Sequence, residues 1–183
     1  MKVTFTKAGV KRYTITIERE NGPALVPRFA PGYDDLMPHD LAHYLVEEYF
    51  EIELGVWGQL AAGGGGIFTP APEDNSLRYQ RRAARIGAIG REDMQRSEHL
   101  VVTTVAAWER TVGRTKHRDF SHGAEVAPDT LRGAVQRMGE VAGRWRALHL
   151  GGSIAFVWPK ELTFDAAKSR RGRRRRSLEP ARG

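Results

Sequence analysis

The spacing of apolar residues changes from strict alternation to helical periodicity near residue 38, and this change constrains the fold most. In segments 3–6 and 12–19, β-branched and aromatic residues alternate with polar ones, which is typical of strands with one buried face. A third apolar segment, Ala24–Val26, follows the turn signal Asn21-Gly22-Pro23. The N-terminal part therefore predicts a small antiparallel sheet of two or three strands.

Helical periodicity dominates the rest of the chain. We expect one helix from Pro38 to Leu54, a short arginine-bearing helix after Ser76, and long helices from about Arg91 to Val112 and from Pro128 to about Leu148. In the first of these, the polar side is expected to face solvent. Segment 153–158 predicts a buried strand that joins the N-terminal sheet. The sequence thus predicts an α+β fold, in which three main amphipathic helices pack on a small, mainly antiparallel sheet.

Charge divides the chain into a neutral body and a basic tail. The chain carries 29 Lys and Arg against 22 Asp and Glu, and eight of these bases but only one acid lie in residues 168–183. The remaining 21 bases and 21 acids cancel. Beyond Asp165 the composition is mostly Arg, Ser and Gly, which is typical of disorder. We therefore expect one globular domain over residues 1–165 and a disordered tail over 166–183.

Several classes of protein are excluded by what the sequence lacks. Cysteine is absent, so disulfides, thiolate catalysis and cysteine-based metal sites are excluded. No apolar run approaches the roughly 18 residues of a membrane-spanning helix, and the N-terminus has no apolar signal-peptide core. Arginine outnumbers lysine 23 to 6, a bias that fits a GC-rich genome. We expect a bacterial, cytoplasmic protein; the sequence allows a homo-oligomer but does not indicate one.

One cluster of residues predicts metal chemistry. His39, His43 and Glu47 are spaced four apart, so a helix places them on one ridge, where two imidazoles can bind a divalent ion such as zinc. Glu47 is then a third ligand or a group that orients an imidazole. Over five residues the spacing resembles the His-Glu-x-x-His helix of zinc metalloproteases. Asp40 stands where that motif has its general-base Glu, and it is one methylene shorter.

A structural interpretation of the same residues stays open. Both histidines lie at the rim of the apolar face, and His43 could simply pair with Glu47 one turn away. The acids between Asp34 and Glu53 are expected to form a solvated face.

Two loops are also considered as sites. A loop with His117, Asp119 and His122 offers a further ligand set. Gly63–Gly66 predicts an irregular loop without the Lys-Ser/Thr of a phosphate-binding motif.

The tail predicts a second kind of function. Seven bases lie within Lys168–Arg176, and they can condense on a polyanion without sequence specificity. The anion-binding residues would be Arg170, Arg171, Arg173, Arg174, Arg175 and Arg176. From the sequence we favour a non-enzymatic interaction module whose tail engages nucleic acid or an acidic protein. The alternative is a metal-dependent hydrolase built on His39, His43 and Glu47, with Asp40 as general base.

Overall fold

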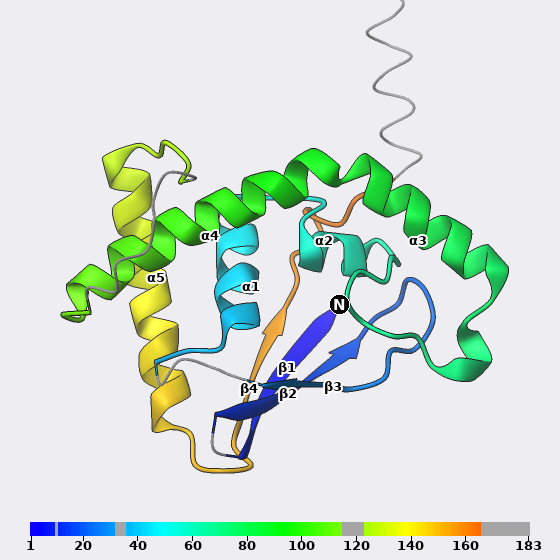
Figure 1. The fold of residues 1–183 in the computed structure, drawn as a ribbon, viewed down its shortest axis with the longest axis horizontal. Helices are drawn as coiled ribbons and strands as arrows, with labels where there is room; N and C mark the ends of the chain where they lie inside the picture. The colour runs from blue at the N-terminus through cyan, green and yellow to red at the C-terminus, as the bar shows by residue number, and fades with distance from the viewer. Residues whose placement is uncertain (10, 32–35, 115–122, 166–183) are drawn as a thin grey trace, which may run out of the picture.

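A four-stranded antiparallel sheet forms the base of the molecule (Figure 1). The computed structural model describes residues 1–9, 11–31, 36–114 and 123–165. The strands are β1 (Lys2–Gly9), β2 (Arg12–Glu18), β3 (Arg28–Pro31) and β4 (Ser153–Val157), in the order β3-β2-β1-β4. The last strand of the chain therefore completes the sheet that the first three begin.

The register of the strands places most large apolar side chains on one face, whereas Phe29 and Val157 lie on the other face and are exposed. Phe5 lies opposite Ile15 on β2 and opposite Ile154 on β4, and all three side chains are buried. Because side chains alternate along a strand, this register also buries Val3, Tyr13 and Phe156 and leaves the intervening positions toward solvent. One face of the sheet is thus available to the helices.

Five α-helices lie between β3 and β4 in the described part of the chain. They are α1 (His39–Tyr49), α2 (Val56–Ala61), α3 (Leu77–Ile89), α4 (Arg91–Thr111) and α5 (Pro128–Ala147), with a short 3-10 helix at Pro72–Asp74. Figure 1 shows α1 and α2 between the sheet and the long α4. Tyr44 of α1 and Trp57 of α2 make the contact with the sheet, at ring-centroid distances of 5.1 Å to Phe156 and 5.7 Å to Phe5.

Because α1 lies between the sheet and α4, it is buried on nearly every side. All seven residues from Leu41 to Glu47 are buried, so α1 has no solvated face over two turns. The expectation that its polar side faces solvent is therefore wrong for Tyr44 and Glu47, which are both 0% exposed. A wheel drawn on one helix does not show that the sheet and α2 cover Tyr44, or that α2 and α4 cover Glu47.

The α+β class and the small antiparallel sheet are confirmed, and the C-terminal strand joins this sheet by pairing with β1. Two local predictions are wrong. The first helix ends at Tyr49 rather than Leu54, because the chain turns at Glu51, whose φ is +52°. The third strand is Arg28–Pro31 rather than Ala24–Val26, where Leu25 forms only an isolated bridge to Pro70.

The glycine-rich segment is irregular, as expected, but three of its four glycines are buried. The Arg19 guanidinium crosses from the end of β2 and donates hydrogen bonds to the carbonyls of Leu60 (3.1 Å) and Gly64 (2.5 Å). A side chain at Gly65 would meet the Tyr79 hydroxyl at 2.5 Å, so the loop fits only without one. No helix in the described ranges is long and apolar enough to cross a membrane.

Candidate functional site

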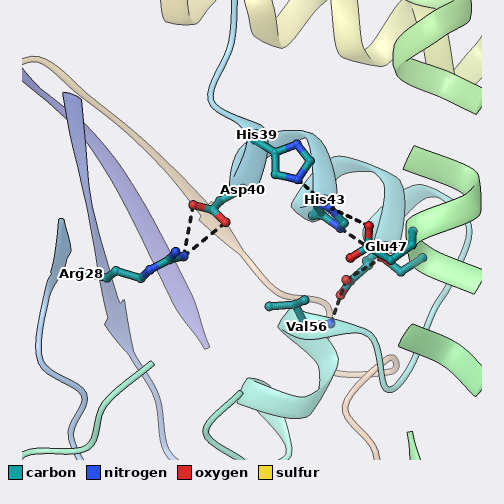
Figure 2. Close-up of polar contacts among 8 residues, drawn as sticks. Arg28, His39, Asp40, His43, Glu47 and Val56 are labelled. Carbon is teal, nitrogen blue, oxygen red and sulfur yellow. Dashed lines mark hydrogen bonds and ion pairs between the residues drawn. The ribbon is translucent and has the colours of Figure 1, made fainter. Parts of the chain in front are cut away.

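The chemistry-bearing residues of α1 lie on two ridges that face different layers. His39, His43 and Glu47 follow one another at four-residue spacing on the side that contacts α4. Asp40 is turned by about 100° from His39 and lies on the side of the sheet. Figure 2 shows this separation, with the Asp40 carboxylate directed toward Arg28 and the imidazoles on the opposite side of the helix.

Glu47 caps the N-terminus of α2 from inside the protein. Its Oε1 accepts a hydrogen bond from the backbone N–H of Val56 at 2.8 Å (Figure 2). Its Oε2 accepts one from the backbone N–H of Trp57, also at 2.8 Å. A carboxylate is favoured there because the first N–H groups of a helix have no partner within the helix. Glycine is required at Gly55, since a Cβ would lie 2.3 Å from the Glu47 Cδ.

Burial and hydrogen bonding act in opposite directions on Glu47. Burial raises its pKa to about 7, and the donors from Trp57, Ser97 and Val56 keep the rise from being larger. The carboxyl therefore changes its charge near neutral pH although it lies in the protein core.

Ser97 of α4 connects Glu47 to His43. Its hydroxyl donates to Glu47 Oε1 at 2.9 Å, and its Oγ lies 3.3 Å from His43 Nδ1. When Glu47 is ionised its carboxylate can only accept, so the single hydroxyl proton points to Glu47 and Oγ is left to accept from His43 Nδ1–H. This chain sets the tautomer of His43 and leaves the lone pair on its Nε2.

The two imidazoles meet through their Nε2 atoms. His43 Nε2 lies 3.1 Å from His39 Nε2, with the rings nearly perpendicular. Burial lowers the pKa of His43 below its ordinary value, and the neighbouring His39 lowers it further. His43 is 5% exposed, whereas His39 is exposed and connects the pair to the surface. A neutral, oriented imidazole nitrogen therefore faces a second one that solvent can reach.

Glu98 lies at the mouth of this pair. Its Oε2 is 3.8 Å from His43 Nε2, and its side chain is 57% exposed. Glu98 follows Ser97 on α4 and brings a carboxylate near His43 Nε2, while Ser97 orients the same ring through Nδ1.

Asp40 is held by the sheet. The Tyr13 hydroxyl donates to Asp40 Oδ2 at 2.5 Å, and Arg28 Nη1 lies 3.3 Å from both carboxylate oxygens. Burial and the Asp40 charge raise the pKa of Tyr13 far above its ordinary value, so Tyr13 keeps its proton and donates a hydrogen bond to Asp40. These contacts tie the N-terminus of α1 to β2 and β3.

The structure brings together some of the residues that the sequence singled out. His39 and His43 converge, Glu47 reaches His43 only through Ser97, and Asp40 points elsewhere. His117, Asp119, His122 and the arginines of the tail lie outside the described residues. Within the described segments, no group of three or more His, Asp or Glu side chains is already arranged to hold a metal ion.

The sequence did carry a signal for Ser97, which the sequence analysis missed. Met94, Val101, Val105 and Trp108 form the apolar stripe of α4, and Ser97 occupies a position of that stripe, three residues after Met94 and four before Val101. A polar residue at a buried helical position needs a hydrogen-bond partner. Its partner could not be identified, because residue 97 and Glu47 are joined only by the packing of α4 on α1.

The titration of Glu47 predicts how stability depends on pH. Its folded-state pKa of about 7 lies above the ordinary 4.5, so between these values the folded state binds more protons than the unfolded chain. The free energy of unfolding therefore falls as pH rises through this window, by about 3 kcal/mol in total at about 1.4 kcal/mol per pKa unit.

Urea unfolding of wild type and Glu47→Gln at about pH 5 and about pH 8 measures this term. Wild type should lose about 2–3 kcal/mol more than the variant across that interval. The lowered pKa of His43 acts in the opposite direction, but it is present in both proteins and cancels in the comparison. Equal slopes for the two proteins would contradict the assignment.

Comparisons of the chain with known protein families, with curated proteins and with solved structures find no match in any of the three.

Proposed function

We propose that the protein binds one divalent transition-metal ion, such as zinc, between His39 Nε2 and His43 Nε2 and uses it for hydrolysis. The approach of these two nitrogens to 3.1 Å carries the proposal. Two zinc–nitrogen bonds of about 2.0–2.1 Å that meet at a tetrahedral angle hold their nitrogens about 3.3 Å apart. The pair therefore needs little rearrangement to share one ion.

The surroundings of His43 support the role of ligand. A metal-bound imidazole usually donates its other N–H to a hydrogen-bond acceptor, which fixes the tautomer and the ring orientation. Ser97 supplies that acceptor, and Glu47 holds the Ser97 hydroxyl in place. The lowered pKa of His43 keeps the ring neutral at pH 7, the form that binds metals. In this proposal Glu47 orients a ligand and is not a ligand itself.

Glu98 is the third ligand in this proposal. Its carboxylate oxygen lies 3.8 Å from His43 Nε2, and its exposed side chain can rotate toward the ion without disturbing the core. Two histidines and one carboxylate leave a position open for water, and a metal ion in such a site lowers the pKa of the bound water and polarises a substrate carbonyl or phosphoryl group.

Asp40 does not serve as the general base in this proposal. Asp40 was expected in this role, but its oxygens accept hydrogen bonds from Tyr13 and Arg28 on the sheet side of α1. We propose instead that Asp40 positions His39, because it anchors the first turn of the helix that carries this histidine.

Metal content of the purified, tag-free protein tests the proposal. Elemental mass spectrometry after incubation with zinc and gel filtration should find about one ion per chain in wild type, and the ion should be lost in His43→Ala. His149→Ala is the matched control, because His149 is exposed on the connection from α5 to β4. This variant should keep the ion. No bound zinc, or equal loss in both variants, would leave His39 and His43 as a hydrogen-bonded pair without a metal role.

For the basic tail we propose a separate role, as a contact for an anionic partner such as nucleic acid. Its support is the charge distribution, in which seven bases lie within nine residues while the rest of the chain is neutral. Such binding releases counterions, with a slope of roughly −0.7 per neutralised phosphate on single strands. With seven bases engaged, affinity for a single-stranded RNA should fall about a thousandfold between about 50 and 200 mM salt.

Fluorescence anisotropy with a labelled RNA of mixed sequence measures this dependence. Replacement of Arg170, Arg171 and Arg173–Arg176 by serine should abolish binding and leave the circular dichroism spectrum unchanged. If the substituted chain binds RNA as tightly as wild type, the tail is not the contact.

A further inference from the structure

A cavity of about 520 Å³ lies at the opposite end of the helical layer from α5, beside α3. The segment that follows β4 forms part of its wall through Thr163, Phe164 and Asp165. Its size falls in the range of small-molecule sites. None of the residues of the proposed metal site lines it, so the cavity is considered independently of that proposal.

The charge of the cavity comes from α3. This helix carries Arg78, Arg81, Arg82 and Arg85 and no acidic residue, and none of the four makes an ion pair with an acid in the described ranges. Their spacing places them on one side of the helix. Two of them, Arg82 and Arg85, line the cavity.

One of these guanidinium groups is already fixed in place. Arg82 Nη2 donates to the Ala62 carbonyl at 2.9 Å, beside the buried glycine loop, which holds the group at the cavity wall. Arg85 has no protein partner in the described structure and is exposed. A ligand there meets one preorganised cation, Arg82, which reduces the entropy cost of binding. The second cation, Arg85, can move toward the ligand.

The remaining wall is apolar. Ile86 and Phe164 pack in a small cluster with Leu54 and Ala62, separate from the main core, and Ile89 is 44% exposed at the rim. Exposed apolar surface beside unpaired guanidinium groups favours a ligand that has both an anionic end and an apolar end.

We infer that this cavity binds a phosphomonoester that carries an apolar group. Each guanidinium presents a fork of two N–H donors, and a terminal phosphate offers three oxygens and a charge of about −1.5 to −2, so it can engage both forks and match both cations, whereas a carboxylate carries a single negative charge. Asp165 also lines the cavity, so its described lining holds two cations and one carboxylate and carries an excess of positive charge that favours an anion. The apolar group then covers Ile86, Ile89 and Phe164.

Phenyl phosphate is the probe, because inorganic phosphate and phenol represent its two halves. Isothermal titration calorimetry with the full chain, at about 0.15 M salt to screen diffuse attraction, should show phenyl phosphate binding at least tenfold more tightly than either half. Arg85→Gln should weaken binding of phenyl phosphate at least tenfold. Arg78→Gln removes the same charge from the same helix outside the cavity and should change affinity less than twofold.

Three results would overturn the inference. One is the absence of saturable binding of phenyl phosphate at millimolar concentration. Another is equal weakening by Arg85→Gln and Arg78→Gln, which would show diffuse attraction to the helix or to the tail. The third is equal affinity for phenyl phosphate and inorganic phosphate, which would show that the apolar wall does not take part. A second variant, Ile89→Ser, should remove most of the preference for phenyl phosphate and leave binding of inorganic phosphate unchanged.

Discussion

Glu47→Ala is expected to lower the free energy of unfolding by about 3–5 kcal/mol, the range seen when one partner of a buried polar network is removed. Three donors lose their acceptor at once: the backbone N–H groups of Val56 and Trp57 and the hydroxyl of Ser97. Glu47 is fully buried, so bulk solvent does not reach these donors. The loss also reaches the core, because Trp57 packs on Phe5 and Tyr44.

Chemical unfolding followed by tryptophan fluorescence measures this difference. Glu48→Ala is the matched control, since Glu48 lies next to Glu47 but is partly exposed and makes only a 3.5 Å ion pair with Arg137. This control should cost less than about 1 kcal/mol, the usual worth of a surface ion pair. A similar loss for the two variants would show that Glu47 is not the cap that holds α2.

Ser97→Ala should lower zinc affinity by about 10- to 100-fold, the usual effect of removing a group that orients a metal-bound imidazole. Without the Ser97 hydroxyl, His43 Nδ1–H has no acceptor and the ring can take the other tautomer, whose Nε2 carries the proton. Competition with a chromophoric zinc chelator measures the affinity.

A loss of stability alone must be separated from this effect. Ser76→Ala serves as the control, because the Ser76 hydroxyl caps α3 by accepting from the Tyr79 N–H at 3.2 Å. Removing an N-cap costs about 1 kcal/mol of stability, yet zinc affinity should not change. If Ser97→Ala binds zinc as tightly as Ser76→Ala, the chain from Glu47 to His43 has no role in metal binding.

The sequence predicted those features of the fold that depend on local pattern. Alternating segments predicted β1 and β2, a short apolar run predicted β4, the cap at Ser76 predicted α3, and apolar stripes predicted α4 and α5 to within a few residues. The end of the first helix was not predictable in this way. Apolar residues continue past Tyr49 to Leu54, but the chain turns so that α2 can present its N-terminus to Glu47.

The site was only half predictable for a related reason. Four-residue spacing identified His39, His43 and Glu47 as one ridge, and this is a property of the helix alone. What faces that ridge depends on α4, which lies about fifty residues later in the chain, so Ser97 and Glu98 could not be assigned to it. The same packing turned Glu47 from an expected surface acid into a buried cap.

In our proposal His39 Nε2 and His43 Nε2 hold one metal ion together, and His43 is oriented through Nδ1. Long-range ¹H–¹⁵N correlation spectra of the imidazoles, recorded without zinc and with one equivalent of zinc, test this arrangement. His43 should carry its proton on Nδ1 before zinc is added, and zinc should shift the Nε2 resonances of His39 and His43 and leave those of His149 unchanged. A His43 protonated on Nε2, or zinc-induced shifts confined to other histidines, would contradict it.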